Sequence, residues 1–132
     1  MHNLERFLIA QTGSVWASNE SGCTYEEALA EVRSGRKRSH WIWYIFPQMK
    51  GLGYSARSQY YGINGREEAK AYIEHPVLRE RLVEICQAVL DSPHSVYDIF
   101  GTDAIKVRSC VLLFASVSDI PVFQHLKARY CW

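Results

Sequence analysis

Apolar residues recur along this chain of 132 residues mostly at the three- and four-residue spacing of helix faces. No stretch alternates apolar and polar residues as a half-buried strand does. Residues that satisfy the free N–H groups of a first helical turn precede most of these segments. The predicted caps are Asn3, Thr24 with Glu27, Ser39, Ser55, Asn64 with Glu67, Ser95 and Thr102. We therefore predict an all-α fold: a single compact domain of about seven to eight helices spanning residues 1–132.

One segment, 41–46, is ambiguous because its six residues are all apolar. Such a run fits a buried strand or a buried helix. Ser39 as a cap and Pro47 as a stop favour a short helix. A residue before proline is disfavoured in the α region, so this helix should end by about Ile45.

The segment 103–117 is predicted to be the central helix. Its stretch from Cys110 to Ala115 is apolar on all sides, which is typical of a fully buried helix. We expect at least two of Leu112, Leu113 and Phe114 to be core residues.

Composition narrows the functional classes and cellular locations that fit this chain. The formal net charge is +1, whereas dedicated nucleic-acid-binding domains carry a large basic excess. The four cysteines form no C-x-x-C pair, the N-terminus lacks the apolar core of a signal peptide, and no apolar run is long enough to span a membrane. These features predict a soluble cytoplasmic protein with free thiols, of which those of Cys86 and Cys110 should be buried and that of Cys131 exposed.

Several stretches together form a family pattern. They are the run from Gly35 to Gln48, Gly51 to Ser55, Glu68 to Leu78, Asp98 to Gly101 and Lys106 to Ser109. In these stretches the chain resembles the domain-of-unknown-function family 1810, whose members are sometimes labelled calpastatin. The resemblance implies a mainly helical single domain and implies no reaction. It gives the calpastatin label no support, since that inhibitor is largely disordered.

A basic run at 36–40, which includes Lys37, precedes the aromatic residues of the ambiguous segment, and two more cations begin the predicted central helix. Arginine forks and helix N-termini suit phosphate or carboxylate, and aromatic faces suit a flat ring. Asp103 is the carboxylate expected to compensate Lys106. The candidate ligand-binding residues are Arg36, Arg38, His40, Trp43, Tyr44, Gln48, Lys106 and Arg108. We expect Arg36, Arg38 and His40 to converge with Lys106 and Arg108 on one concavity.

Two functional hypotheses follow from this surface. The first is a pocket that binds an anionic small molecule, a nucleotide-like one included. The second is an interaction module in which the same surface docks an acidic protein segment or RNA. A solvated basic turn without a site remains the structural alternative. The chain lacks phosphate-loop, dinucleotide, zinc-protease and serine-hydrolase motifs and shows no metal-ligand spacing, so we expect no cofactor and no metal and assign no catalytic residue.

Overall fold

The structure, a computed structural model, describes residues 3–13 and 23–132. Val15 and Trp16, which the sequence predicts to be the apolar anchor of a Gly- and Ser-rich loop, lie outside these residues. The elements, in chain order, are α1 (Glu5–Gln11), α2 (Tyr25–Arg33), α3 (Ile42–Ile45), α4 (Ala56–Tyr61), α5 (Gly65–Glu74), α6 (Pro76–Asp91), α7 (Val96–Phe100), the 3-10 helix η1 (Gly101–Asp103), α8 (Ala104–Val117) and α9 (Pro121–Tyr130).

The fold is all-α, as predicted. Extended pairing within the described residues amounts to one isolated parallel bridge between Met49 and Ile63. The ambiguous apolar segment forms the single turn α3 and ends at Ile45. Its high apolar content reflects burial, because Trp41, Ile42, Tyr44, Ile45 and Phe46 are all core residues.

Several helix starts follow their local signals. Thr24 accepts from the backbone N–H of Glu27, whose side chain in turn accepts from the backbone N–H of Thr24. Ser55 caps α4 in a similar way by accepting from the N–H of Ser58. Ser95 caps α7 and Pro76 stands at the first turn of α6. Each of these interactions lies within one turn, so the sequence alone specifies it.

Four predicted caps are wrong. Asn3 and Thr102 make no capping bond: the residue before α1 is Leu4, and α8 follows η1 with Asp103 as its uncapped start. The side chain of Asn64 caps nothing either, because a carboxylate of the next helix turn, that of Glu68, accepts from the backbone N–H of Asn64. Ser39 is the fourth, and its hydroxyl donates to another helix instead.

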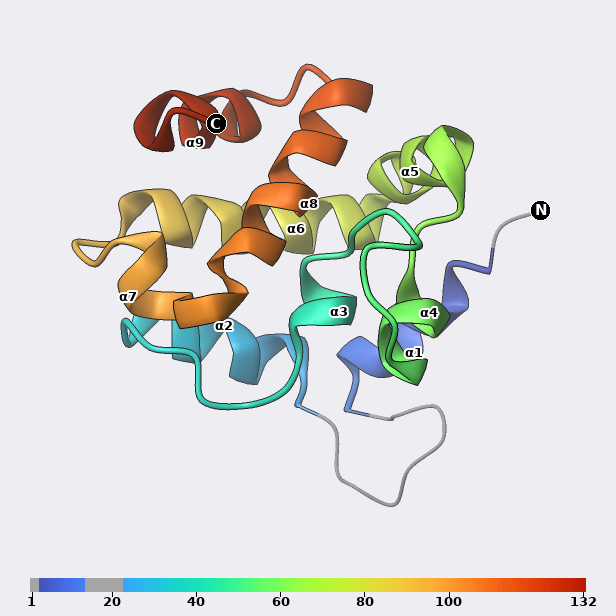
Figure 1. Cartoon of the computed structure of the whole chain (residues 1–132), viewed down its shortest axis with the longest axis horizontal. Helices are drawn as coiled ribbons and strands as arrows, with labels where there is room; N and C mark the ends of the chain where they lie inside the picture. Colours follow the sequence, from blue (N-terminus) through green and yellow to red (C-terminus); the bar gives the residue numbers. More distant parts are fainter. Residues whose placement is uncertain (1–2, 14–22) are drawn as a thin grey trace.

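The long helix α6 organises the domain. It packs against α2, α5 and α9, and α8 crosses in front of it in Figure 1 while packing against α5, α7 and α9. The core between these helices is apolar and aromatic, with Leu78, Leu82 and Ile85 of α6 fully buried beside Phe114 of α8 and Phe123 of α9.

The prediction for α8 was partly wrong. Phe114 is fully buried, but Leu112 and Leu113 are only half-buried, so fewer than two of the three belong to the core. The helix packs mainly through one side, on which Val107, Cys110, Val111 and Phe114 lie. Apolar residues all around a helix therefore did not mean neighbours all around it.

Two further expectations concern the thiols and the membrane. All four cysteines, each of which the structure describes, are free; Cys86 and Cys110 are buried and Cys131 is exposed, as predicted. Among the described helices, none has the length and apolar character needed to cross a membrane.

Candidate functional site

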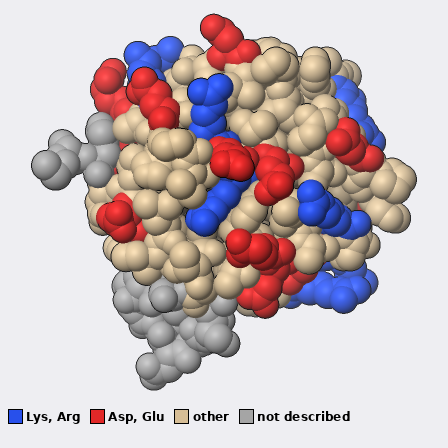
Figure 2. Space-filling view, turned by 180° about the vertical axis from the view of Figure 1, so that it is seen from behind, with Lys and Arg blue, Asp and Glu red and all other residues tan. Residues whose placement is uncertain are grey.

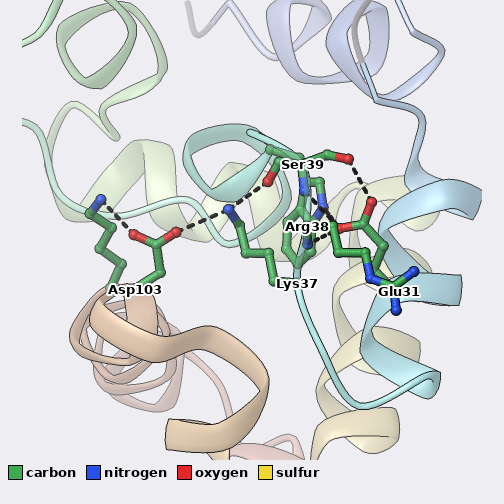
Figure 3. Close-up of polar contacts among 7 residues, drawn as sticks. Glu31, Lys37, Arg38, Ser39 and Asp103 are labelled. Carbon is green, nitrogen blue, oxygen red and sulfur yellow. Dashed lines mark hydrogen bonds and ion pairs between the residues drawn. The ribbon is translucent and has the colours of Figure 1, made fainter.

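The basic turn between α2 and α3 is held by one carboxylate, that of Glu31 on α2. Its Oε1 accepts from the backbone N–H groups of Arg38 and Ser39 at 2.6 and 3.0 Å. Its Oε2 accepts from the Ser39 hydroxyl at 2.6 Å, and the indole N–H of Trp41 donates to Oε1 at 2.9 Å. Figure 3 shows Glu31 facing this turn from α2. The backbone donors of Arg38 and Ser39 are thus occupied by a side chain of the protein.

These bonds also set the protonation of the carboxyl group. Burial alone would raise the pKa of Glu31, but the hydrogen bonds from Ser39, Arg38 and Trp41 outweigh it and lower the pKa below its ordinary value. Glu31 therefore stays ionised in the folded protein at neutral pH and fixes the path of the turn.

A second carboxylate, that of Asp103, joins the turn to the start of α8. Its Oδ2 lies 3.0 Å from the Nζ of Lys37, and its Oδ1 lies 2.8 Å from the Nζ of Lys106. Lys37 also donates to the backbone carbonyl of Ser39, so its ammonium group lies between two oxygens (Figure 3). Burial raises the pKa of Asp103, but the two lysines more than compensate, and the net shift is downward.

Each of these two lysines also lies over an indole ring. The Nζ of Lys37 is 5.1 Å from the centroid of Trp41, and that of Lys106 is 4.8 Å from the centroid of Trp43. Both distances are within the range of a cation–π interaction. The lysine side chains are consequently fixed by packing as well as by charge, and the side chain of Lys37 is only 9% exposed.

A pocket of about 390 Å3 opens at this cluster. The turn before α3, α3 itself, the first turn of α4 and the start of α8 all contribute to it. The lining residues that carry charge or a polar side chain are Lys37, His40, Ser55, Arg57, Asp103 and Lys106, and the aromatic ones are Trp41, Trp43 and Tyr44.

The structure brings together four of the eight residues proposed from sequence: His40, Trp43, Tyr44 and Lys106 all line this pocket. The predicted convergence holds for His40 and Lys106 and fails for the three arginines. Arg36, Arg38 and Arg108 are exposed and lie outside the described lining of the pocket.

The reasons for this separation are local. Glu31 holds the backbone of Arg38 and of the following residue, and Arg38 itself is exposed to solvent. Arg108 follows Lys106 by two positions on α8, a spacing that places two side chains on different faces of a helix. Gln48 is buried and lies outside the described pocket lining, and its side-chain Nε2 has no hydrogen-bond partner among residues 3–13 and 23–132.

Tyr44 contributes a wall rather than a proton donor to a ligand. Its hydroxyl donates to the backbone carbonyl of Cys23 at 2.7 Å. Burial raises the pKa of Tyr44 well above its ordinary value, so the phenol remains neutral. Tyr44 is only 2% exposed, so little of its surface is open to a ligand.

Sequence reasoning missed Arg57 and Ser55 as lining residues, and it included Lys37 in the basic surface without proposing it as a ligand contact. Ser55 carried only a capping signal, which it also fulfils. Nothing in the local pattern distinguishes Lys37 from its two arginine neighbours; only the position of Asp103 does so.

Comparison with known proteins gives a family and one fold neighbour. The family described as "Protein of unknown function (DUF1810)" matches residues 1–132. The crystal structure of the conserved hypothetical protein Rv1873 from Mycobacterium tuberculosis is similar over 96% of this chain and 86% of that chain, with 38% sequence identity and a TM-score of 0.85. No curated protein matches the chain.

Proposed function

This chain belongs to the DUF1810 family, whose description names no activity, and we propose from its pocket that it binds an anionic small molecule, nucleotide-like ligands included. The observation that carries the proposal is the arrangement of Lys37 and Lys106, held on the two oxygens of Asp103 at one pocket. The proposal assigns a binding site and no reaction.

The charge balance of the pocket favours an anion. Lys37 and Lys106 contribute two positive charges to its lining, and Asp103 contributes one negative charge. Like charges brought together in a partly buried site repel one another, and a bound anion relieves that repulsion. These three groups together carry a net positive charge, which favours a bound anion.

The size and aromatic content of the pocket support a small organic anion over a bare inorganic ion. A volume of about 390 Å3 lies within the usual range for ligand pockets, roughly 300–1,000 Å3. Trp43 is half-buried at the pocket and offers apolar surface next to the cations. A phosphate or carboxylate on the lysines with a flat group near Trp43 would use both features.

The test is thermal unfolding of the protein with added phosphate, a nucleoside monophosphate and the corresponding nucleoside. A ligand that binds only the folded state raises the melting temperature. We expect the monophosphate to raise it most, phosphate less, and the uncharged nucleoside least. Lys106→Gln, which removes the charge and keeps a polar side chain, should abolish the shift.

The matched control is Arg38→Gln, an exposed cation of the same turn that lies outside the described pocket lining. This variant should keep the shift given by the monophosphate. Absence of any anion-dependent shift in the wild-type protein would refute the proposal. Equal losses in Lys106→Gln and Arg38→Gln would indicate diffuse charge rather than this pocket.

A second candidate function is the interaction module that docks an acidic protein segment or RNA on the same surface. It is favoured by the exposure of Arg36 and Arg38 beside the pocket and by Tyr54, which is 95% exposed next to the pocket residue Ser55. A polyanion displaces many counterions, so its affinity falls steeply with salt, whereas that of a small anion falls gently. The slope of affinity against salt concentration therefore separates the two candidates.

A cytoplasmic location is part of the proposal. It is supported by the four free cysteines, since oxidising compartments favour disulfides and reducing ones keep thiols free.

A further inference from the structure

A larger concavity follows the outer side of α6. It is separate from the pocket at Lys37, Asp103 and Lys106, here called the anion pocket. Its volume is about 920 Å3, and its described lining residues include none that lines the anion pocket. It extends from Pro76 at the first turn of α6 to Pro93 just past its end. A helix of this length spans about 24 Å, so the feature is an elongated groove. In Figure 1 α6 lies behind α8, and Figure 2 views the molecule from that side.

Part of the lining of this groove, here called the α6 groove, is apolar. Val83, Ala88 and Ile120 line it, and all three are partly buried against the core. Pro76 and Pro93 add apolar surface at its two ends. These residues offer a partner hydrophobic area of the kind that drives association.

The charged lining of the α6 groove is acidic on balance. Four carboxylates line it, and two guanidinium groups, those of Arg33 and Arg79, oppose them. The carboxylates belong to Glu74, Glu80, Glu84 and Asp91. Three of the four lie on α6 itself, at positions 80, 84 and 91, along the length of the groove. Figure 2 shows acidic side chains gathered around the middle of this face with basic ones between them.

We propose that the α6 groove docks a basic amphipathic helix of a partner protein. The length of the groove and its apolar lining residues suit the apolar stripe of a helix of about four turns. The carboxylates in the lining suit lysine or arginine beside that stripe, which is electrostatic complementarity that sets the partner and its orientation. The same carboxylates repel phosphate, so this face is unsuited to RNA.

Within the part of the chain that the structure describes, Glu84 and Asp91 accept hydrogen bonds from uncharged groups. Glu84 accepts from the hydroxyl of Tyr25 at 2.6 Å, and Asp91 accepts from Gln87 within its own helix at 2.9 Å. Neither bond neutralises the charge of the carboxylate. Glu80 is exposed on the same helix and lies between them and Pro76.

The proposal is tested with synthetic peptides of about 16 residues, the length of α6, titrated into the whole protein. The first has a leucine stripe at helical spacing flanked by lysines. The second keeps the leucines and replaces every lysine by glutamate, and the third has the composition of the first in scrambled order. We expect calorimetry to detect binding of the first peptide only. In NMR spectra of the protein, the backbone amide signals that shift on adding this peptide should cluster between residues 76 and 93.

The decisive variant is the charge reversal Glu80→Lys with Asp91→Lys. It should weaken the lysine peptide at least about tenfold, because like charges then face each other across the interface. The matched control, Glu5→Lys with Glu67→Lys, reverses two exposed carboxylates outside the described groove lining and should change affinity less than about twofold. Circular dichroism establishes that both variants fold.

Three results would overturn the proposal: no binding of the lysine peptide, equal binding of the glutamate or scrambled peptide, or equal weakening in both double variants. Preferential binding of a single-stranded RNA to residues 76–93 would also overturn it, since it would contradict the charge argument.

Discussion

The indole N–H of Trp41 donates to the carboxylate of Glu31 across 2.9 Å, although the two residues belong to different elements and are ten positions apart. The same carboxylate binds the Arg38 and Ser39 N–H groups that come just before Trp41 in the chain. A side chain of α2 thus fixes both the backbone and the aromatic ring on which the pocket is built. This dependence leads to a direct test.

Glu31→Ala should lower the free energy of unfolding by about 1–3 kcal/mol. Removing a charged acceptor leaves its partly buried donors unsatisfied, and hydrogen bonds to charged groups contribute within that range. Urea denaturation followed by Trp fluorescence measures the loss and also reports the environment of Trp41. Glu26→Ala, an exposed residue of the same helix, serves as control and should cost less than about 0.5 kcal/mol.

Stability should fall in acid through Glu31 and Asp103. Both carboxyl groups have a lower pKa in the folded protein than in the unfolded chain, so the unfolded chain binds protons first as the pH falls. Their contribution is present above the ordinary carboxyl pKa of about 4 and is lost as the pH drops through the lower folded values. Unfolding free energies measured between neutral pH and pH 3 should decline more gently in Glu31→Gln with Asp103→Asn; parallel curves would contradict this.

The buried ion pair between Arg6 and Glu68 should contribute more to the free energy of unfolding than the contacts of Glu31 do. Nη2 of Arg6 lies 2.6 Å from Oε1 of Glu68, and both side chains are almost fully buried. Arg6 also donates to the backbone carbonyls of Tyr60 and Gly62. Arg6→Met should cost about 3–5 kcal/mol, because it removes the guanidinium group paired with the buried carboxylate of Glu68.

The control for that variant is Arg108→Met, an exposed arginine, which should cost less than about 0.5 kcal/mol. Replacing both partners, by Arg6→Met with Glu68→Leu, should cost less than the sum of the two single changes. An additive result in denaturation would show that the pair does not act as a unit.

Phe114→Ala should cost about 3–5 kcal/mol, the usual range for deleting a buried aromatic ring. The ring is fully buried, with its centroid 5.2 Å from that of Tyr72 and 6.2 Å from that of Phe123. Leu112→Ala on the same helix removes a half-buried side chain and should cost about 1 kcal/mol. Equal losses of unfolding free energy in Phe114→Ala and Leu112→Ala, measured by urea denaturation, would mean that α8 is buried on both sides.

The helices could be predicted because most of their signals are local. Thr24, Ser55 and Ser95 each cap a helix whose partner lies three residues along the chain. Ser39 and Asn64 carry the same signals, yet distant or later carboxylates take over: Glu31 accepts from the hydroxyl of Ser39, and Glu68 accepts from the backbone of Asn64. Such competition depends on which helices meet, which the local pattern does not contain.

The site was predictable to a similar extent. Sequence indicated the basic-aromatic turn and the pairing of Lys106 with Asp103, which the structure confirms at 2.8 Å. It favoured Arg36 and Arg38 over Lys37, although only Lys37 of the three lines the pocket. Three consecutive cations look equivalent in a sequence, and the fold selects one of them through a carboxylate more than sixty residues away.

Helix α2 carries one side chain that supports the anion pocket and another that lines the α6 groove. Glu31 binds the turn that forms the anion pocket, and Arg33, two positions further on, lines the α6 groove. A small rotation or translation of α2 against α6 would therefore change the anion pocket and the α6 groove together. Thermodynamic linkage requires such coupling to be reciprocal. If an anion in the pocket changes the affinity of the α6 groove for its partner by some factor, the partner changes the affinity of the pocket for the anion by the same factor.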